Sequence, residues 1–153
     1  MDLTVTRTYA APPERVWAAL TESELVMRWW GPDGFSSPRA RMDVRPGGAS
    51  LVTMRSPDGF ELHNTWTYTV VDPPHRLEYV LRFSDDGGRT LAPSSLGLPA
   101  DIPEAGVPHE VTLTPSGHGT ELTVTERGYG SADTVALSRL GLEQTLEKLA
   151  AVL

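Results

Sequence analysis

The stretch LHNTWTYTVVDPPHRLEYVLRF, Leu62 to Phe83, contains two runs in which apolar and polar residues alternate, joined by Asp72-Pro73-Pro74. Alternation with a period of two is typical of β-strands that have one face in the core and one in solvent. Adjacent prolines interrupt a strand and favour a turn. The stretch therefore predicts an antiparallel hairpin. The larger side chains on its inward face are Asn64, Trp66, Tyr68, Tyr79 and Phe83.

The same alternation recurs on both sides of this hairpin, and turn sequences rich in Gly and Pro separate the runs. One example is Ser56-Pro57-Asp58-Gly59, in which proline is preset for the bend and glycine is free to take a positive φ. We therefore expect a seven-stranded antiparallel sheet. The further strands are predicted near residues 3–9, 38–44, 50–54, 111–113 and 122–124.

Three segments follow helical rather than strand periodicity. Pro12-Pro13 opens the first of two short helices, because proline is tolerated in the first turn of a helix. Thr21 to Glu24 matches a capping box and predicts the start of the second helix, which ends before Gly31. A long helix is predicted from its cap at Ser131 to Leu153. Helices gathered on one face of an antiparallel sheet make an α+β fold.

The long helix is too small to cover the inward face of so many strands. We therefore expect the sheet to curve around it and to leave a cavity, which is the usual form of a ligand site. Leu137 and Leu140 lie nearly opposite the apolar stripe of the helix. Either the long loop over residues 89–107, which we expect to fold back onto the body, or a second copy in a homodimer would cover these two leucines.

Length and composition exclude several classes of function. The chain has 153 residues, which fits a single domain over residues 1–153. Its net charge of −7 disfavours nucleic acid as a partner, and the absence of cysteine excludes disulfides and thiolate metal sites. We see no signal peptide and no apolar run near the roughly 20 residues that a membrane span needs. A cytoplasmic protein without a membrane span is expected.

No arrangement of polar residues predicts catalysis, a metal or a cofactor. The histidines at 63, 75, 109 and 118 lack metal-ligand spacing, and each is interpreted as a surface residue. The glutamates of the predicted strands are interpreted as outward-facing, so no carboxylate pair is placed for acid–base chemistry. An enzyme is therefore not expected, although side chains distant in the sequence can converge in the fold. The glutamates in question are Glu61, Glu78, Glu110, Glu121 and Glu126.

Several segments, in this order, resemble one known family. They are APPERVWAALTESELVMRWWGPDGF (11–35), DVRPGGASLVTMRSPDG (43–59), VVDPPHRLEYV (70–80), VTLTPSGHGTELTVTE (111–126) and GLEQTLEKLAAVL (141–153). They are similar to segments of the SRPBCC superfamily, which includes START domains and birch-pollen-type allergens. Within it, they resemble the branch that is similar to the C-terminal domain of the heat-shock-chaperone ATPase activator. The resemblance implies a helix-grip fold, in which a seven-stranded antiparallel sheet is curved around a long C-terminal helix.

The resemblance also implies a cavity, because members of the superfamily bind lipids, sterols, hormones or polyketides, and a minority are enzymes. One departure is visible: members often have Gly-Trp where this chain has Gly141-Leu142. The smaller leucine would enlarge or reshape the pocket. We therefore expect binding of a small, mainly hydrophobic or aromatic molecule. The alternatives are an interaction protein like the chaperone-ATPase activator, and a cavity enzyme such as a cyclase or hydrolase.

The candidate cavity-lining residues combine the inward hairpin residues with the aromatic, methionine and leucine side chains around them. Trp29 and Trp30 are adjacent, and residues about 100° apart on a helix point in different directions. One ring is expected to close the core and the other to face the cavity mouth or solvent, and the sequence does not say which. For each candidate, plain core packing is the alternative. The candidates are Trp29, Trp30, Phe35, Met42, Met54, Asn64, Trp66, Tyr68, Tyr79, Phe83, Leu142 and Leu146.

Overall fold

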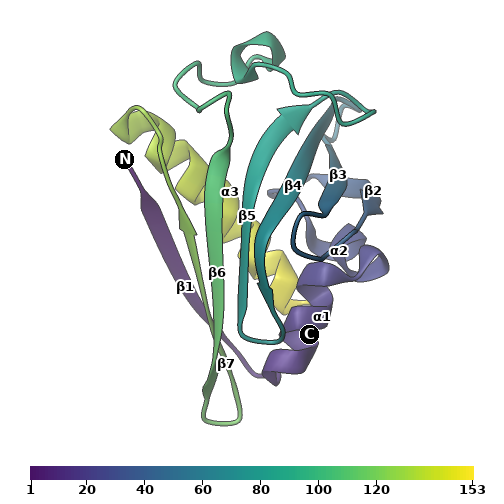
Figure 1. Cartoon of the computed structure of the whole chain (residues 1–153), viewed down its shortest axis with the longest axis vertical. Helices are drawn as coiled ribbons and strands as arrows, with labels where there is room; N and C mark the ends of the chain where they lie inside the picture. Colours follow the sequence, from purple (N-terminus) through teal and green to yellow (C-terminus); the bar gives the residue numbers. More distant parts are fainter.

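The computed structural model describes all residues of the chain, 1–153 (Figure 1). One sheet of seven strands carries a long helix on one face, with two short helices between the first and second strands. The elements in chain order are β1 (Leu3–Tyr9), α1 (Pro13–Thr21), α2 (Ser23–Trp29), β2 (Ser36–Arg41), β3 (Ala49–Arg55), β4 (Glu61–Asp72), β5 (Arg76–Ser84), the 3-10 helix η1 (Pro93–Leu96), β6 (Val107–Ser116), β7 (Gly119–Glu126) and α3 (Ala132–Ala150).

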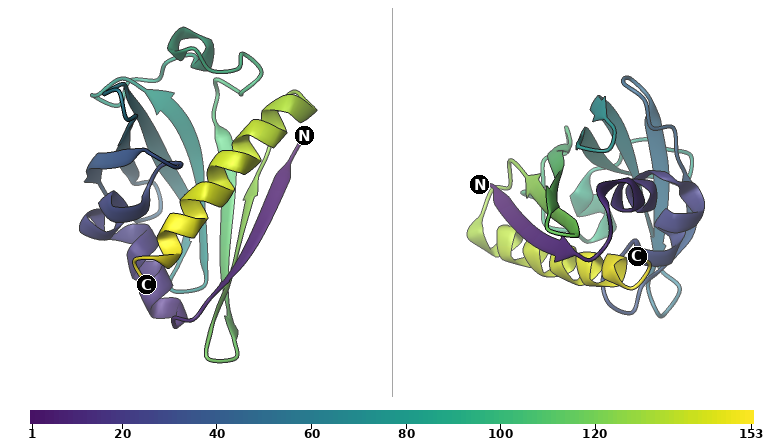
Figure 2. Two further views of the ribbon diagram at one scale, coloured as in Figure 1. Left: turned by 180° about the vertical axis from the view of Figure 1, so that it is seen from behind. Right: turned by 90° about the horizontal axis from the view of Figure 1, so that it is seen from below.

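The sheet is antiparallel throughout, with strand order β1-β7-β6-β5-β4-β3-β2. The N-terminal strand therefore pairs with the last strand, and the others follow as a meander. Seen from behind and from below, α3 crosses one face of a sheet that curves around it (Figure 2). The α+β helix-grip fold predicted from the sequence is confirmed.

The hairpin over residues 62–83 forms as predicted from β4 and β5. Its register places Tyr68 opposite Tyr79 and Trp66 opposite Leu81, and a β-bulge interrupts the pairing between Tyr68 and Val70. All four of these paired side chains belong to the hydrophobic core. Alternation along the strands thus correctly predicted which face of the hairpin is buried.

The capping box predicted at Thr21–Glu24 does not form. Glu22 caps both short helices, as the C-cap of α1 and the N-cap of α2, and its side chain makes no capping hydrogen bond. The hydroxyl of Thr21 instead donates to the carbonyl oxygen of Trp17, 2.8 Å away. The prediction was wrong because Thr21 belongs to the last turn of α1, where its hydroxyl bonds back to the carbonyl four residues earlier.

The cap and the core face of α3 agree with the sequence. The Ser131 hydroxyl oxygen accepts a hydrogen bond from the backbone N–H of Thr134 at 3.2 Å, and the apolar stripe packs against the core. None of the helices is both long and apolar enough to cross a membrane. The stripe consists of Val135, Leu142, Leu146, Leu149 and Leu153.

The segment 89–107 folds back onto the body at the end of the sheet where α3 begins. Ile102 is buried, and the Asp101 carboxylate accepts a hydrogen bond from the Thr134 hydroxyl at 2.6 Å. The segment does not cover Leu137 and Leu140, which remain 56% and 54% exposed. A homodimer over these two leucines stays a prediction.

Candidate functional site

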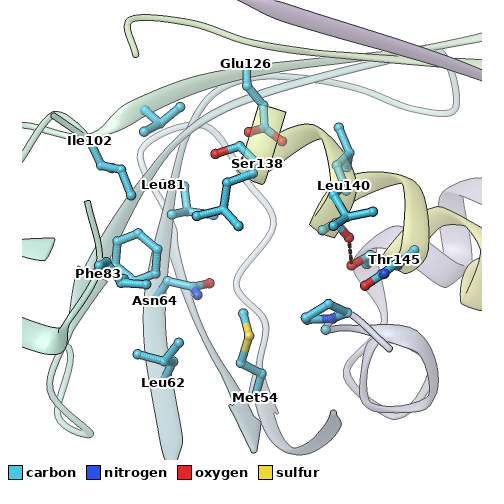
Figure 3. A pocket seen from close by; sticks show the side chains of 18 of the residues that line it. Met54, Leu62, Asn64, Leu81, Phe83, Ile102, Glu126, Ser138, Leu140 and Thr145 are labelled. Carbon is cyan, nitrogen blue, oxygen red and sulfur yellow. Dashed lines mark hydrogen bonds between the residues drawn. The ribbon is translucent and has the colours of Figure 1, made fainter. Parts of the chain in front are cut away.

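A cavity of about 420 Å³ lies between the sheet and α3, with the folded-back segment on one side (Figure 3). Of its 23 lining residues, 13 are hydrophobic, so the cavity suits a mainly apolar occupant. The exposed leucines of α3 are part of this lining and mark where the cavity opens to solvent. The hydrophobic side chains contributed by strands β3 to β6 are Met54, Leu62, Leu81, Phe83 and Val107.

Space in the cavity comes partly from a glycine in the middle of α3. Gly141 lines the cavity, and a Cβ added there would meet no heavy atom within 4 Å. The helix residues around it, Leu137, Leu140 and Leu142, face the same space. The missing side chain at Gly141 therefore leaves space between these neighbouring side chains of the helix.

Half of the candidate residues predicted from the sequence line this cavity. Asn64 and Phe83 face each other across β4 and β5, and Trp30 and Phe35 approach from the chain after α2. The cavity thus brings together residues from five separate segments. The six are Trp30, Phe35, Met54, Asn64, Phe83 and Leu142.

The other six candidates lie outside the cavity, in the surrounding core. Alternation reveals the buried face of a strand, but not where along that face the helices press against it. Tyr68 and Tyr79, two rungs beyond Trp66 and Leu81 on the same hairpin, are fully packed, and the hydroxyl of Tyr68 contacts that of Ser50 at 2.8 Å. The six are Trp29, Met42, Trp66, Tyr68, Tyr79 and Leu146.

The two adjacent tryptophans separate as predicted, and the structure identifies which is which. Trp29 is buried, and its indole N–H donates to the carbonyl oxygen of Ala19 at 2.8 Å. Trp30 lines the cavity, with its ring edge-on to that of Trp29 at a centroid distance of 5.7 Å. Trp29 closes the core beside α1, and Trp30 forms part of the cavity wall.

A histidine–glutamate pair lies in the cavity wall. His109 and Glu126 are only 7% and 6% exposed, and His109 Nε2 lies 3.4 Å from Glu126 Oε2. The Tyr129 hydroxyl donates to Glu126 Oε1 at 2.5 Å, and His109 Nδ1 lies 2.9 Å from the carbonyl oxygen of Val107, to which it donates. Tyr79 stacks on the imidazole at a centroid distance of 4.9 Å. The pair is therefore held from several sides.

The family model described as "Activator of Hsp90 ATPase homolog 1-like protein" matches residues 10–153 of this chain. The chain belongs to this family. Membership agrees with the resemblance found in the five sequence segments and with the helix-grip fold. No curated protein matches the chain.

Solved structures similar to this family member share its fold over nearly the whole chain. Protein CV1439 from Chromobacterium violaceum has a TM-score of 0.80 and 24% identity, covering 100% of this chain and 97% of that one. Protein Ms6760 from Mycobacterium smegmatis has a TM-score of 0.79 and 26% identity, covering 99% and 90%. The AHSA1 protein from Silicibacter pomeroyi has a TM-score of 0.79 and 24% identity, covering 99% and 96%.

The buried pair of this Hsp90-activator-like chain corrects two interpretations made from the sequence. His109 and Glu126 were both expected at the surface, yet they face each other across β6 and β7 on the inner side of the sheet. The sequence pattern did contain this information, because alternate residues of a strand share a face. Glu126 lies on the same face of β7 as Leu122 and Val124, which are buried. Charged residues are almost never fully buried unless they are paired, and the partner of Glu126 lies on another strand.

Two opposing effects determine the pKa values of this pair. Burial by itself lowers the pKa of His109, but the charge and hydrogen bond of Glu126, with the Val107 carbonyl, raise the pKa above its ordinary value. Burial by itself raises the pKa of Glu126, but His109 and the Tyr129 hydroxyl bring that pKa below its ordinary value. Between the lowered pKa of Glu126 and the raised pKa of His109, an imidazolium therefore faces a carboxylate.

We expect this pair to give the protein a bell-shaped pH dependence of stability. A raised folded pKa means that the contribution of His109 is fully present below the unfolded value of 6.5 and is lost as pH rises through the folded pKa. A lowered folded pKa means that the contribution of Glu126 is present above 4.5 and is lost as pH falls through the folded pKa. Urea denaturation across pH 4 to 9 measures the profile.

The control for this pH profile is the double variant His109→Phe/Glu126→Leu, which should lack the part of the curve that depends on the pair. A profile that is identical in the double variant and the unaltered protein would show that other groups produce the pH dependence.

Proposed function

We propose that this protein binds a small, mainly hydrophobic or aromatic molecule in the cavity between the sheet and α3. The observation that carries the proposal is the cavity itself, about 420 Å³ with a mostly hydrophobic lining. Its volume falls within the roughly 300–1,000 Å³ of ordinary small-molecule sites. A few polar side chains interrupt the apolar wall, and one of them, Asn64, would orient the bound molecule.

The exposed leucines of α3 support this proposal. Leu137 and Leu140 are large apolar side chains, each more than half exposed, and both face the cavity opening. Burial of apolar surface is worth about 25 cal/mol per Å², so an occupant that covers these side chains gains affinity from them. Met54 adds an unbranched, polarisable wall that adapts to ligands of different shape.

The contacts of the His109–Glu126 pair favour binding over catalysis. A general acid or base needs an atom free to exchange a proton with the substrate. Here one carboxylate oxygen accepts from Tyr129, the other faces His109, and His109 Nδ1 donates to Val107. The pair is thus occupied by its own protein partners. The cavity enzyme considered from the sequence remains the alternative.

A probe of matching chemistry tests the proposed function. N-phenyl-1-naphthylamine is neutral and aromatic, and its fluorescence rises in an apolar site. Titration should give saturable binding at one site. Gly141→Phe should weaken that binding by at least about tenfold, because the new ring would occupy space that is open in front of Gly141.

Two variants control for changes in the helix itself. Ala136→Phe adds the same ring to α3 at an exposed position outside the cavity and should leave probe binding unchanged. Gly141→Ala adds one methyl group in open space, should retain binding, and should raise the free energy of unfolding by about 0.5–1 kcal/mol. Equal binding to Gly141→Phe and the unaltered protein would contradict the proposal.

A further inference from the structure

Asn64 presents an unused hydrogen-bond donor to the cavity. Its side chain is only 1% exposed, and Oδ1 lies 3.0 Å from the indole nitrogen of Trp66. An indole N–H can only donate, so the amide atom that faces it must be the oxygen. The Nδ2 group, with two N–H donors, is therefore directed elsewhere, and Figure 3 shows the amide pointing into the cavity.

No protein group uses this donor. The only hydrogen bond made by the side-chain amide of Asn64 is the one that Oδ1 accepts from the indole of Trp66. Nδ2 has no partner in the protein, yet it is not completely buried. The donor is thus reached from the cavity space alone. Buried polar groups in folded proteins are normally paired, so an open donor in an apolar wall indicates a partner supplied from outside the chain.

Trp30, which also lines the cavity, has a donor without a partner, but this donor is buried inside the wall. Its indole N–H is buried and has no acceptor within hydrogen-bonding distance. The Trp30 ring packs edge-on against that of Trp66 at a centroid distance of 4.9 Å, and Trp66 in turn holds Asn64. The Trp30 donor is closed to the cavity, so Asn64 Nδ2 is the unpaired donor that an occupant can reach.

The charges around the cavity exclude a strongly anionic partner for the Asn64 donor. His109 is the only side chain in the lining that can carry a positive charge, and Glu126 already faces it at 3.4 Å. Lys148, which lies behind the lining, donates to the carbonyl oxygens of Gly31 and Phe35. A carboxylate in the cavity would be desolvated with no unpaired cation beside it, and this is costly.

We propose that the bound molecule is a neutral carbonyl compound whose oxygen accepts a hydrogen bond from Nδ2 of Asn64. Its apolar or aromatic body would lie against Phe83, Met54 and Leu62, the lining residues nearest to Asn64 along the sheet. A carbonyl uses the open donor without bringing a further proton that needs an acceptor. The inference rests on the proposed function and adds the chemical class of the ligand.

Matched probes separate the carbonyl from the rest of the molecule. Benzophenone and diphenylmethane carry the same two rings and differ in a carbonyl against a methylene group, and diphenylacetate adds a negative charge instead. Calorimetric or fluorescence-displacement titration should give benzophenone about tenfold tighter binding than diphenylmethane, and weaker binding for diphenylacetate than for either.

The variant Asn64→Leu tests whether the preference for benzophenone depends on the Nδ2 donor of Asn64. It should reduce the ratio between benzophenone and diphenylmethane to about one while diphenylmethane still binds. Thr65→Val is the matched control, because Thr65 follows on the same strand, faces the other side of the sheet and should leave the ratio unchanged. The probe comparison on the unaltered protein keeps the inference testable if Asn64→Leu does not fold.

The outcomes distinguish the two proposals. Equal affinity of the unaltered protein for benzophenone and diphenylmethane overturns the carbonyl inference and leaves the proposed function standing. Tightest binding by diphenylacetate overturns the assignment of a neutral ligand. A benzophenone preference that persists in Asn64→Leu overturns the role of Asn64. Binding of none of the three probes, together with no binding of N-phenyl-1-naphthylamine, overturns the proposed function and the inference with it.

Discussion

Replacing Glu126 by leucine should lower the free energy of unfolding by about 3–5 kcal/mol, as expected when one member of a buried ion pair is removed. The change leaves His109 Nε2 and the Tyr129 hydroxyl without their shared partner in a wall that is almost closed to water. His109 would then have to give up its charge or remain buried and unpaired. Urea denaturation at pH 6, where both charges of the pair are present, measures the loss.

The matched control removes both charges together. His109→Phe/Glu126→Leu leaves no buried charge unpaired, and the phenyl ring preserves the stacking on Tyr79. Replacing both members of a buried pair by apolar groups of similar size is often neutral or stabilising, so the double variant should be more stable than Glu126→Leu alone. A cost below 1 kcal/mol for Glu126→Leu, or strict additivity in the double-mutant cycle, would contradict this account of the pair.

Trp66→Ala should cost about 3–5 kcal/mol of stability, the range for deleting a large buried aromatic side chain. Trp66 is 2% exposed, stacks on Tyr79 at a centroid distance of 5.0 Å and contacts the edge of Trp30. It also donates the hydrogen bond that orients Asn64. Chemical denaturation should show an unchanged m-value and a lower midpoint.

Trp17→Ala is the matched control for this second prediction. Trp17 is of the same residue type but only partly buried at the edge of the core, so its removal should cost clearly less. Trp66→Phe keeps an aromatic ring and loses the indole donor. Its loss of stability should lie between those of Trp66→Ala and Trp17→Ala. Equal losses for Trp66→Ala and Trp17→Ala would mean that the contacts of Trp66 do not carry the energy assigned to them.

Alternation along the strands was sufficient to predict the sheet, because side chains on a strand can only point to one face or the other. It placed Asn64, Trp66 and Tyr79 on the inner face correctly. Alternation also predicts an inward position for Glu126, whereas the charge of this residue favours the surface. A buried charge is stable only with a partner, and that partner, His109, is on another strand.

The boundaries of the short helices show the limit of local patterns. Thr21 to Glu24 satisfies the residue pattern of a capping box, yet the hydroxyl of Thr21 serves the preceding helix. A capping pattern describes which residues are compatible with a cap, whereas the direction of the chain before it decides which backbone group lies within reach. Ser131 has no helix directly before it, and its predicted cap formed.

By itself, the sequence determined the α+β helix-grip fold, the family and the inner face of the sheet, because each depends on periodicity or on the order of short segments. Only the tertiary structure decided that Trp30 rather than Trp29 faces the cavity, that His109 and Glu126 meet in its wall, and that Asn64 keeps a free donor. These features depend on how α3, the segment after α2 and the strands pack around the cavity, and on the space left in front of Gly141. That arrangement results from packing between distant segments, and no local pattern records it.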